Sequence, residues 1–255
     1  MRYFIHLAYK GTAYRGWQRQ SNTELSVQQI LENAVTKMTG IKTTIMGCGR
    51  TDAGVHAMQF FAHFDYDGSW SFDPVERLNR VLPEDISVFE IIEVDKRAHS
   101  RYDAMSRSYE YHIHFEKNPY LSTFSYYAEQ IQPDISLLNQ GLEMLKGMED
   151  FRYMCLTPDR VNNTRCTIFE VSAAYSDDKK RLVIKFTANR FLKSMIRIIT
   201  ARLIALSTGR ISWDTFVNVS TGKEKLKFYR MAYANGLHLS RIVYPYLERE
   251  VQVKW

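Results

Sequence analysis

Strand-like and helix-like segments follow one another without a regular βαβ alternation, and this order limits the folds open to the chain. Residues 2–9 (RYFIHLAY) read as a first strand, and residues 107–115 (RSYEYHIHF) alternate cleanly, with Tyr109 and Tyr111 on one face. Two more strand patterns, CTIFEVSAAY and RLVIKFTA, flank the polar residues 176–180, which is typical of a hairpin. Hairpins mixed with helices favour an α+β fold with a mainly antiparallel sheet.

Four segments carry helical signals. Ser26 and Gln29 fit a capping box at the start of the first helix, and Gly40 is placed to end it. The other three are expected in residues 73–83, from residue 133 onward, and in FLKSMIRIITARLIALSTG after residue 189. That last segment is the longest, and its apolar stripe leaves three cations together on another face: Arg190, Lys193 and Arg197.

The chain is long enough, at 255 residues, for one large domain or two of ordinary size. It contains no low-complexity segment and no Pro/Gly/Ser-rich linker, so two domains would have to share a continuous interface. One strand ends and a new strand series begins around residues 97–105. We therefore expect an N-terminal half at residues 1–104 and a C-terminal half at residues 105–255.

The charge balance is basic. Thirty-four Lys and Arg residues against 28 Asp and Glu give a formal net charge of +6. A surplus of this kind suits a polyanionic partner such as RNA or DNA, but charge alone does not separate nucleic-acid binders from other basic proteins.

Several features indicate a cytoplasmic protein. No apolar run approaches the roughly 18–20 residues that span a bilayer, so no membrane association is predicted. The N-terminal MRYFIHLAYKGT lacks the apolar core of a secretory signal. The three cysteines, Cys48, Cys155 and Cys166, show no C-x-x-C spacing, which argues against a disulfide framework and a zinc site.

Metal and nucleotide-cofactor sites are not indicated. His56, His63 and His99 together with Asp52 match no recurrent ligand spacing, and ordinary structural histidines explain them better. The chain has no G-x-G-x-x-G after a strand and no phosphate-binding P-loop motif. We expect neither a metal nor a cofactor.

The most informative short stretch is GCGRTDAGVHAMQFFAHF, residues 47–64. It places Arg50, Thr51 and Asp52 between two glycines and just before a strongly apolar strand. Asp52 is either a turn residue whose side chain bonds its own backbone or a carboxylate held in place for chemistry. Arg50 is either a phosphate contact or half of a surface ion pair. The residues alone leave both questions open.

A resemblance bears on this choice. The block GRTDAGVHA is similar to the signature of the tRNA pseudouridine synthase A family. Further segments that resemble the family follow in its order and span nearly the whole chain: YKGTAYRGWQRQ, SVQQILENAV, NRVLPEDISV, AHSRYDAMSRSYEY, MLKGMEDF, TRCTIFEV, NRFLKSMIR and GLHLSRIVY.

The resemblance implies a fold and an activity. The expected fold is two related α+β halves whose mainly antiparallel sheets abut, with the active site in a central cleft. The expected activity is isomerase chemistry, the conversion of uridine to pseudouridine in the anticodon stem-loop of tRNA, at positions 38–40. It needs no cofactor. The resemblance also implies a homodimer that grips one tRNA.

Site residues are carried over position by position. Asp52 matches the catalytic aspartate of the family, Arg197 the arginine paired with it, and Tyr109 the tyrosine that lies against the target base. Arg50 matches the arginine of the catalytic loop, which fills the gap left by a flipped uridine. Surface cations, among them Arg15, Arg19 and Lys193, would bind phosphates without reading sequence.

Three places depart from the family's pattern. Ile198 stands where an asparagine is usual, Ala201 where a glycine is usual, and the C-terminal block reads AYANGLHL. A divergent synthase acting on other uridines is therefore an alternative. A non-catalytic RNA-binding α+β module is a second alternative, and a carboxylate-dependent nucleoside or glycoside hydrolase is a third.

Overall fold

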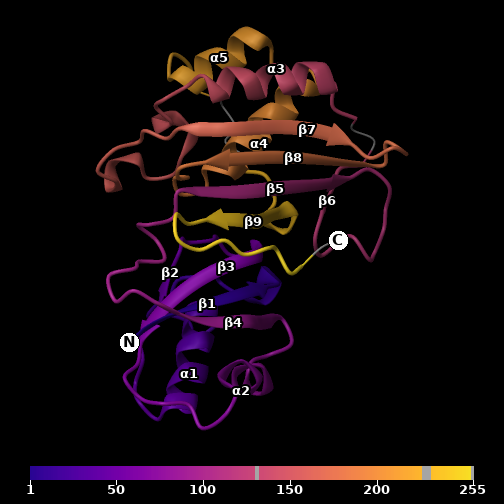
Figure 1. The fold of residues 1–255 in the computed structure, drawn as a ribbon. Coiled ribbons are helices and arrows are strands. Elements are labelled where there is room, and N and C mark those ends of the chain that lie inside the picture. Colours follow the sequence, from indigo (N-terminus) through magenta and orange to yellow (C-terminus); the bar gives the residue numbers. More distant parts are fainter. Residues whose placement is uncertain (130–131, 226–230, 254–255) are drawn as a thin grey trace. The chain divides into compact units, whose positions relative to one another are not determined.

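The structure is a computed structural model that describes residues 1–129, 132–225 and 231–253 (Figure 1). The chain forms two compact units. Unit 1 comprises Met1–Arg107 and His238–Trp255, and unit 2 comprises Ser108–Leu237. Both units combine helices with mainly antiparallel strands, which confirms the predicted α+β class. None of the helices in the described segments has the length and hydrophobicity of a membrane span.

Unit 1 is built on a sheet whose strand order is β4-β1-β3-β9, with β2 paired to β3. β1 runs antiparallel to both β3 and β4, whereas β3 and β9 are parallel. The strands are β1 (Arg2–Tyr9), β2 (Met46–Gly47), β3 (His56–Asp65), β4 (Ile86–Val94) and β9 (Leu237–Val243). Nearly every residue of β1 and β3 is buried, so these two strands form the centre of the core of unit 1.

The helices of unit 1 begin and end where their capping residues predict. In α1 (Val27–Thr39), the Oγ of Ser26 accepts a hydrogen bond from the backbone N of Gln29 at 3.2 Å, and Gly40 closes the helix with φ of 72°. In α2 (Pro74–Val81), Asp73 accepts from two backbone N–H groups. A short 3₁₀ helix, η1 (Gly11–Ala13), follows β1.

Unit 2 contains the strand order β5-β8-β7, with β6 pairing in parallel with β5. The strands are β5 (Ser106–His114), β6 (Tyr126–Tyr127), β7 (Ile168–Tyr175) and β8 (Arg181–Ala188). The helices are α3 (Ile135–Lys146), α4 (Met195–Ser207) and α5 (Trp213–Thr221), with 3₁₀ turns η2 (Arg152–Met154), η3 (Pro158–Arg160) and η4 (Ala234–Gly236). The β7–β8 pair is antiparallel and confirms the predicted hairpin.

The two units divide the chain differently from the expected halves 1–104 and 105–255. Residues 238–255 belong to unit 1, because β9 pairs with β3 and the backbone N of Ile242 donates to Oε1 of the buried Gln59 at 2.9 Å. A strand that returns to its sheet after a long excursion leaves no local signal in the sequence. Whether the two units are related halves stays a prediction.

Two secondary-structure predictions were wrong. The long helix α4 begins at Met195, because Ser194 has φ of 57° and cannot continue a right-handed helix. Arg190 and Lys193 therefore precede the helix and do not share a helical face with Arg197. The segment TTIMGCG also reads as a strand that runs into the Asp52 motif, but the structure limits that strand to Met46–Gly47. The helix α5 was not predicted.

A buried histidine ties β2 to the rest of unit 1. The Nδ1 of His63 accepts from the backbone N of Ser100 at 3.2 Å. The hydroxyl of Ser100 lies 2.8 Å from this nitrogen and 2.8 Å from the carbonyl oxygen of Met46, and it donates its one hydrogen to one of these two acceptors. His63 is 5% exposed, and burial, with a smaller contribution from the charge of Arg2, lowers its pKa to about 4. The neutral ring is thus part of the support for the strand that leads into the loop of residues 48–55.

This burial predicts a pH-dependent loss of stability. Between pH about 6.5 and about 4 the unfolded chain protonates His63 and the folded chain does not, so the free energy of unfolding falls as the pH drops through this window. The contribution is up to about 3 kcal/mol. Urea unfolding at pH 7 and at pH 4.5 gives the decrease in the free energy of unfolding between the two pH values. This decrease should be smaller for His63→Asn than for wild type, because asparagine keeps an acceptor but does not titrate. Equal decreases in the two proteins would contradict this interpretation.

Candidate active site

The loop that carries Asp52 connects β2 to β3 in unit 1 and ends in a tight turn. The carbonyl of Asp52 accepts from the backbone N of Val55 at 3.2 Å, and Gly54, the third residue of that turn, has φ of 79°. A turn with a positive φ at this position favours glycine. Asp52 itself is partly exposed at the start of the turn, so its carboxylate is held near the surface of unit 1.

The two glycines that flank the loop have different roles. Gly54 requires its left-handed backbone, whereas a Cβ at Gly49 would meet nothing within 4 Å. We expect Gly49→Ala to change the free energy of unfolding by less than about 0.5 kcal/mol and to leave any activity intact. Gly54→Ala should lose about 1–2 kcal/mol, because alanine is strained in this region. Thermal unfolding of both variants checks this, and equal losses would contradict it.

A second loop, residues 10–17, packs against the first and fixes its backbone. The backbone N of Trp17 donates to the carbonyl of Thr51 at 3.2 Å, and the hydroxyl groups of Tyr9 and Thr51 are 2.9 Å apart. The approach is so close that a Cβ on Gly16 would lie 2.5 Å from the carbonyl oxygen of Thr51, and one on Gly11 would lie 1.9 Å from that of Val55. Both glycines are therefore required by contact with backbone atoms.

Trp17 supports the loop from within the core of unit 1. Its ring is 2% exposed and stacks on Phe60 of β3 at a centroid distance of 4.0 Å. A Cβ on Gly47 would lie 2.5 Å from the indole, so β2 can pass the ring only as glycine. In the sequence, the segment YRGWQRQ reads as a loop in which aromatic residues mix with Arg15 and Arg19. No role was predicted for Trp17, although a large aromatic residue beside a glycine was a signal.

Arg107 holds the start of the Asp52 loop. Its guanidinium donates to the carbonyl of Cys48 through Nη2 at 2.8 Å and through Nε at 3.3 Å, and to the carbonyl of Arg101 at 2.6 Å. Cys48 is fully buried, and this burial raises the pKa of its thiol to about 12, so the thiol stays protonated at neutral pH. Sequence reasoning missed Arg107, which lies in the RSYEY strand beside the predicted tyrosine.

The other two predicted catalytic residues belong to unit 2. Tyr109 lies on β5, is 8% exposed, and meets the ring of Phe191 edge-on at a centroid distance of 5.2 Å. Arg197 lies in the first turn of α4 and is partly exposed. Its Nε donates to the carbonyl of Ala232 at 2.8 Å, and the backbone N of Ala232 donates back to the carbonyl of Arg197 at 3.0 Å.

Tyr111 supports the segment that holds Arg197. It is fully buried, and its hydroxyl donates to the carbonyl of Tyr233 at 3.0 Å. Burial raises the pKa of Tyr111 far above its ordinary value, with the charge of Arg197 acting in the opposite direction. Tyr111 is therefore a neutral donor beside the candidate arginine. That Asp52, Tyr109 and Arg197 act on one uridine stays a prediction.

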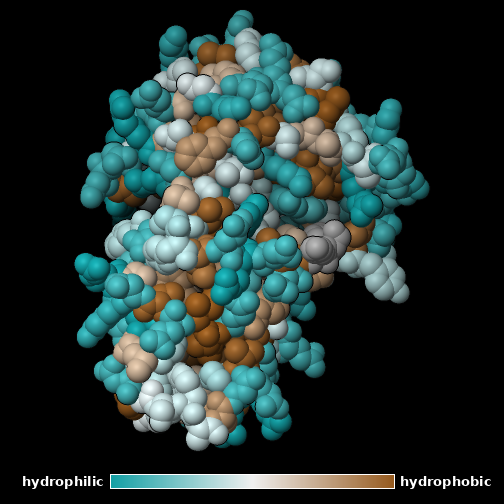
Figure 2. Space-filling model, viewed as in Figure 1, coloured by the Kyte–Doolittle hydropathy of each residue, from teal (hydrophilic) through white to brown (hydrophobic). Residues whose placement is uncertain are grey.

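The predicted phosphate-binding cations are surface residues. Arg50 lies within the Asp52 loop, Arg15 lies next to Gly16 in the supporting loop, and Lys193 precedes α4; all three are exposed. Arg19 differs from them, because its guanidinium pairs with the buried carboxylate of Glu32 at 2.6 Å. On the face shown in Figure 2, hydrophilic residues are interspersed with hydrophobic patches.

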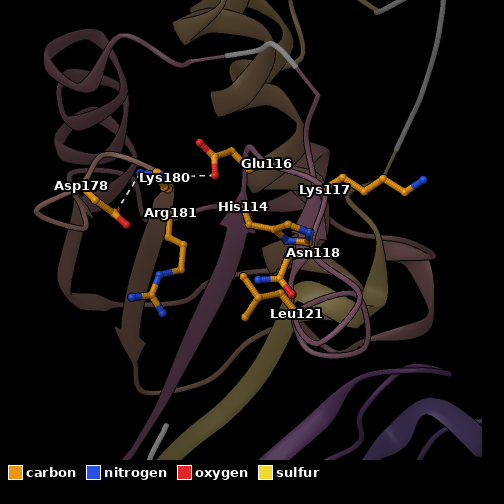
Figure 3. Close-up of a pocket in the computed structure, with 8 residues that line it drawn as sticks. All are labelled: His114, Glu116, Lys117, Asn118, Leu121, Asp178, Lys180 and Arg181. Atoms are coloured by element: carbon orange, nitrogen blue, oxygen red, sulfur yellow. Dashed lines mark hydrogen bonds and ion pairs between the residues drawn. The ribbon is translucent and has the colours of Figure 1, made fainter.

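Unit 2 also contains a pocket of about 280 Å³ beside the β7–β8 hairpin turn (Figure 3). The buried ring of His114 and the side chain of Arg181 line it. Lys180 and Glu116, which also line the pocket, form an ion pair at 2.9 Å. The residues drawn there include none of the predicted site residues. The described segments also contain no group of three or more His, Cys, Asp or Glu residues placed to hold a metal ion.

Comparison with known proteins defines the class. A family model described as tRNA pseudouridine synthase matches residues 6–103 and 142–245, more than half of the chain. The chain therefore belongs to the tRNA pseudouridine synthase family, and the enzyme class of that family is isomerase.

Individual relatives cover almost the full length. The chain is 37% identical over 246 residues to a protein named tRNA pseudouridine synthase A from Bacteroides fragilis, with 96% of each chain covered. It is 36% identical over 247 residues to a protein of the same name from Parabacteroides distasonis, again with 96% of each chain covered. The corresponding protein of Porphyromonas gingivalis is 34% identical over 247 residues, covering 96% of this chain and 97% of its own.

Proposed function

We propose that this chain converts uridine to pseudouridine in the anticodon stem-loop of tRNA, without a cofactor, with Asp52 as its central catalytic group. The observation that carries the proposal is the close packing of two loops that fixes the backbone around Asp52. Two loops interlock through Gly11, Gly16 and the Thr51 carbonyl, so that a short segment with one carboxylate is fixed at the surface of unit 1. A turn that needed Asp52 only as a capping residue would not require this second loop.

The reaction is an isomerisation. The bond between N1 of uracil and C1′ of the ribose breaks, the base turns, C5 bonds to C1′, and the proton on C5 leaves while N1 gains one. The carboxylate of Asp52 either adds covalently, at C6 of uracil or at C1′, or stabilises the charge that develops as the bond breaks. A glycal route that begins with removal of the 2′ proton uses the same carboxylate as base.

Arg197 and Tyr109 of unit 2 and Arg50 of unit 1 supply the other proposed roles. A guanidinium such as that of Arg197 favours the ionised form of a carboxylate. Its Nε is bonded to the carbonyl of Ala232, so the remaining N–H groups extend from a fixed position. Tyr109, nearly buried against Phe191, provides a flat surface and a hydroxyl group for the target base. Arg50, exposed in the Asp52 loop, fills the space that the flipped uridine leaves in the RNA.

The proposed partner is tRNA, bound by a homodimer in the cytoplasm. The formal charge of +6 and the exposed Arg15 and Lys193 fit contacts to phosphates that do not depend on base sequence.

The departures from the family's pattern lie in different environments in the structure, so they differ in what they imply for the choice of target uridine. Ile198 is 1% exposed within α4 and packs in the core of unit 2, so its replacement of asparagine is a packing change. Ala201 is partly exposed on the same helix. The argument for target positions other than those of the family therefore rests on Ala201 and on the C-terminal block, which includes the exposed Tyr233.

Unmodified tRNA transcripts test the proposal. Purified protein is incubated with them without added metal or nucleotide, and pseudouridine is mapped by carbodiimide adducts and primer extension. Modification confined to the anticodon stem-loop supports the proposed function. Modification elsewhere supports a divergent synthase, release of free uracil supports a hydrolase, and binding without any chemistry supports the RNA-binding module.

A further inference from the structure

Two tyrosines of unit 2 form a stacked pair at the surface. The rings of Tyr126, in β6, and Tyr233, just before η4, have centroids 5.0 Å apart and planes 17° from parallel. Tyr126 is partly exposed, whereas Tyr233 has 65% of its surface in solvent. A large aromatic ring that is ordered by a stacked neighbour and yet mostly exposed has the form of a surface prepared for a flat ligand.

The segments that carry the two rings are fixed to each other. The side-chain Nδ2 of Asn235 donates to the carbonyl of Ser122 at 2.9 Å and to that of Ser125 at 3.0 Å, joining the segment after Tyr233 to the one before Tyr126. The hydroxyl of the buried Tyr111 also donates a hydrogen bond to the carbonyl of Tyr233. A Cβ on Gly236 would lie 2.8 Å from the carbonyl oxygen of His112, so this segment also lies directly against β5. The pair is therefore preorganised.

The pair is also coupled to the candidate arginine. Ala232, the residue before Tyr233, exchanges two hydrogen bonds with Arg197, one through its carbonyl and one through its backbone N. The backbone that sets the Arg197 guanidinium thus continues directly into the stacked ring. A ligand that binds the Arg197 guanidinium and extends along residues 232–233 therefore reaches the tyrosine pair.

We propose that Tyr233, backed by Tyr126, is a stacking platform for an unpaired base of the RNA, a nucleotide beside the one that reacts. Every base has a π face, so a tyrosine stack binds a loop nucleotide without reading its identity. Tyr233 lies in the block AYANGLHL, which departs from the pattern of the family, and it gives this chain a contact for the strand that approaches Arg197. This inference rests on the proposed function for the identity of the ligand as RNA.

The test measures RNA affinity and base stacking directly. An anticodon stem-loop RNA carries 2-aminopurine, whose fluorescence is quenched by stacking, at one loop position at a time. Wild-type protein is compared with Tyr233→Ala and Tyr233→Phe. Tyr120→Ala is the matched control, because Tyr120 is 89% exposed in the same unit. Removal of one base–aromatic stack is expected to weaken binding by about 5- to 150-fold.

The proposal expects a specific pattern. Tyr233→Ala should bind the RNA more weakly and should no longer quench the 2-aminopurine fluorescence at one loop position. Tyr233→Phe should keep both the affinity and the quenching of wild type. Tyr120→Ala should behave as wild type. In turnover assays Tyr233→Ala should raise KM more than it lowers kcat. A purely structural role for residues 232–233 in holding Arg197 would instead lower kcat at saturating RNA.

The result distinguishes this inference from the proposed function. If wild-type protein forms pseudouridine but Tyr233→Ala binds RNA as tightly as wild type, the platform is overturned and the function stands. If wild-type protein forms no pseudouridine, the proposed function is wrong. The stacking platform is then still tested by the ratio of the RNA affinities of wild type and Tyr233→Ala. Equal losses in Tyr233→Ala and Tyr120→Ala would also overturn it.

Discussion

We expect the Asp52→Asn variant to form pseudouridine at least about 10³-fold more slowly than wild type while it retains most of its affinity for tRNA. The substitution keeps the size of the side chain and removes its charge and its nucleophilic oxygen. The loop should persist, because the bond from the backbone N of Val55 to the carbonyl of residue 52 and the bond from the backbone N of Trp17 to Thr51 involve main-chain atoms only. Single-turnover assays on transcripts and a separate binding titration measure the two effects.

The matched control for this variant is Asp177→Asn, which removes the same charge from an exposed position in the β7–β8 turn. It should leave the rate of pseudouridine formation unchanged. If Asp52→Asn instead loses affinity and activity to the same extent, Asp52 acts in RNA binding, and the non-catalytic module becomes the better account of this loop.

Gly16→Ala should have the second-largest effect, through contact with the Asp52 loop. Gly16 has φ of 95°, and a Cβ there would lie 2.5 Å from the carbonyl oxygen of Thr51, the residue before Asp52. Because that oxygen belongs to the backbone, the loop must move to admit the methyl group. We expect a loss of at least about 2 kcal/mol in the free energy of unfolding. Displacement of Asp52 should lower kcat/KM by about 10²-fold.

Gly40→Ala separates backbone strain from this contact. Gly40 has φ of 72°, so alanine is strained there too, but a Cβ would meet nothing within 4 Å. This control should lose about 1 kcal/mol of stability and keep its activity. Thermal unfolding and turnover of both variants decide the matter: a Gly16→Ala protein as active as Gly40→Ala would show that the close approach of the two loops does not position Asp52.

Local signals in the sequence predicted most of the elements. The strand at residues 2–9 and the helix capped by Ser26 and Gly40 have the expected bounds, because alternation and capping are written in neighbouring residues. The start of α4 was misplaced because residues 189–194 continue an apolar pattern that looks helical, while the left-handed backbone of Ser194 is set by its surroundings.

The candidate site was predicted only in part. The GRTDAG block drew attention to Asp52, and Gly54 does occupy the left-handed turn position that a flanking glycine suggests. The residues that support the loop were not predicted, since Trp17 and Arg107 act through contacts with residues more than thirty positions away in the sequence. Periodicity and spacing carry no information about such contacts.

The parallel pairing of β9 with β3 has a consequence for synthesis on the ribosome. Unit 1 takes its fourth main strand from residues that follow the whole of unit 2, so a nascent chain ending at Arg107 lacks the partner whose backbone satisfies the buried Gln59. Unit 1 therefore cannot complete its sheet, and the edge of β3 that pairs with β9 stays uncovered, until unit 2 has been translated.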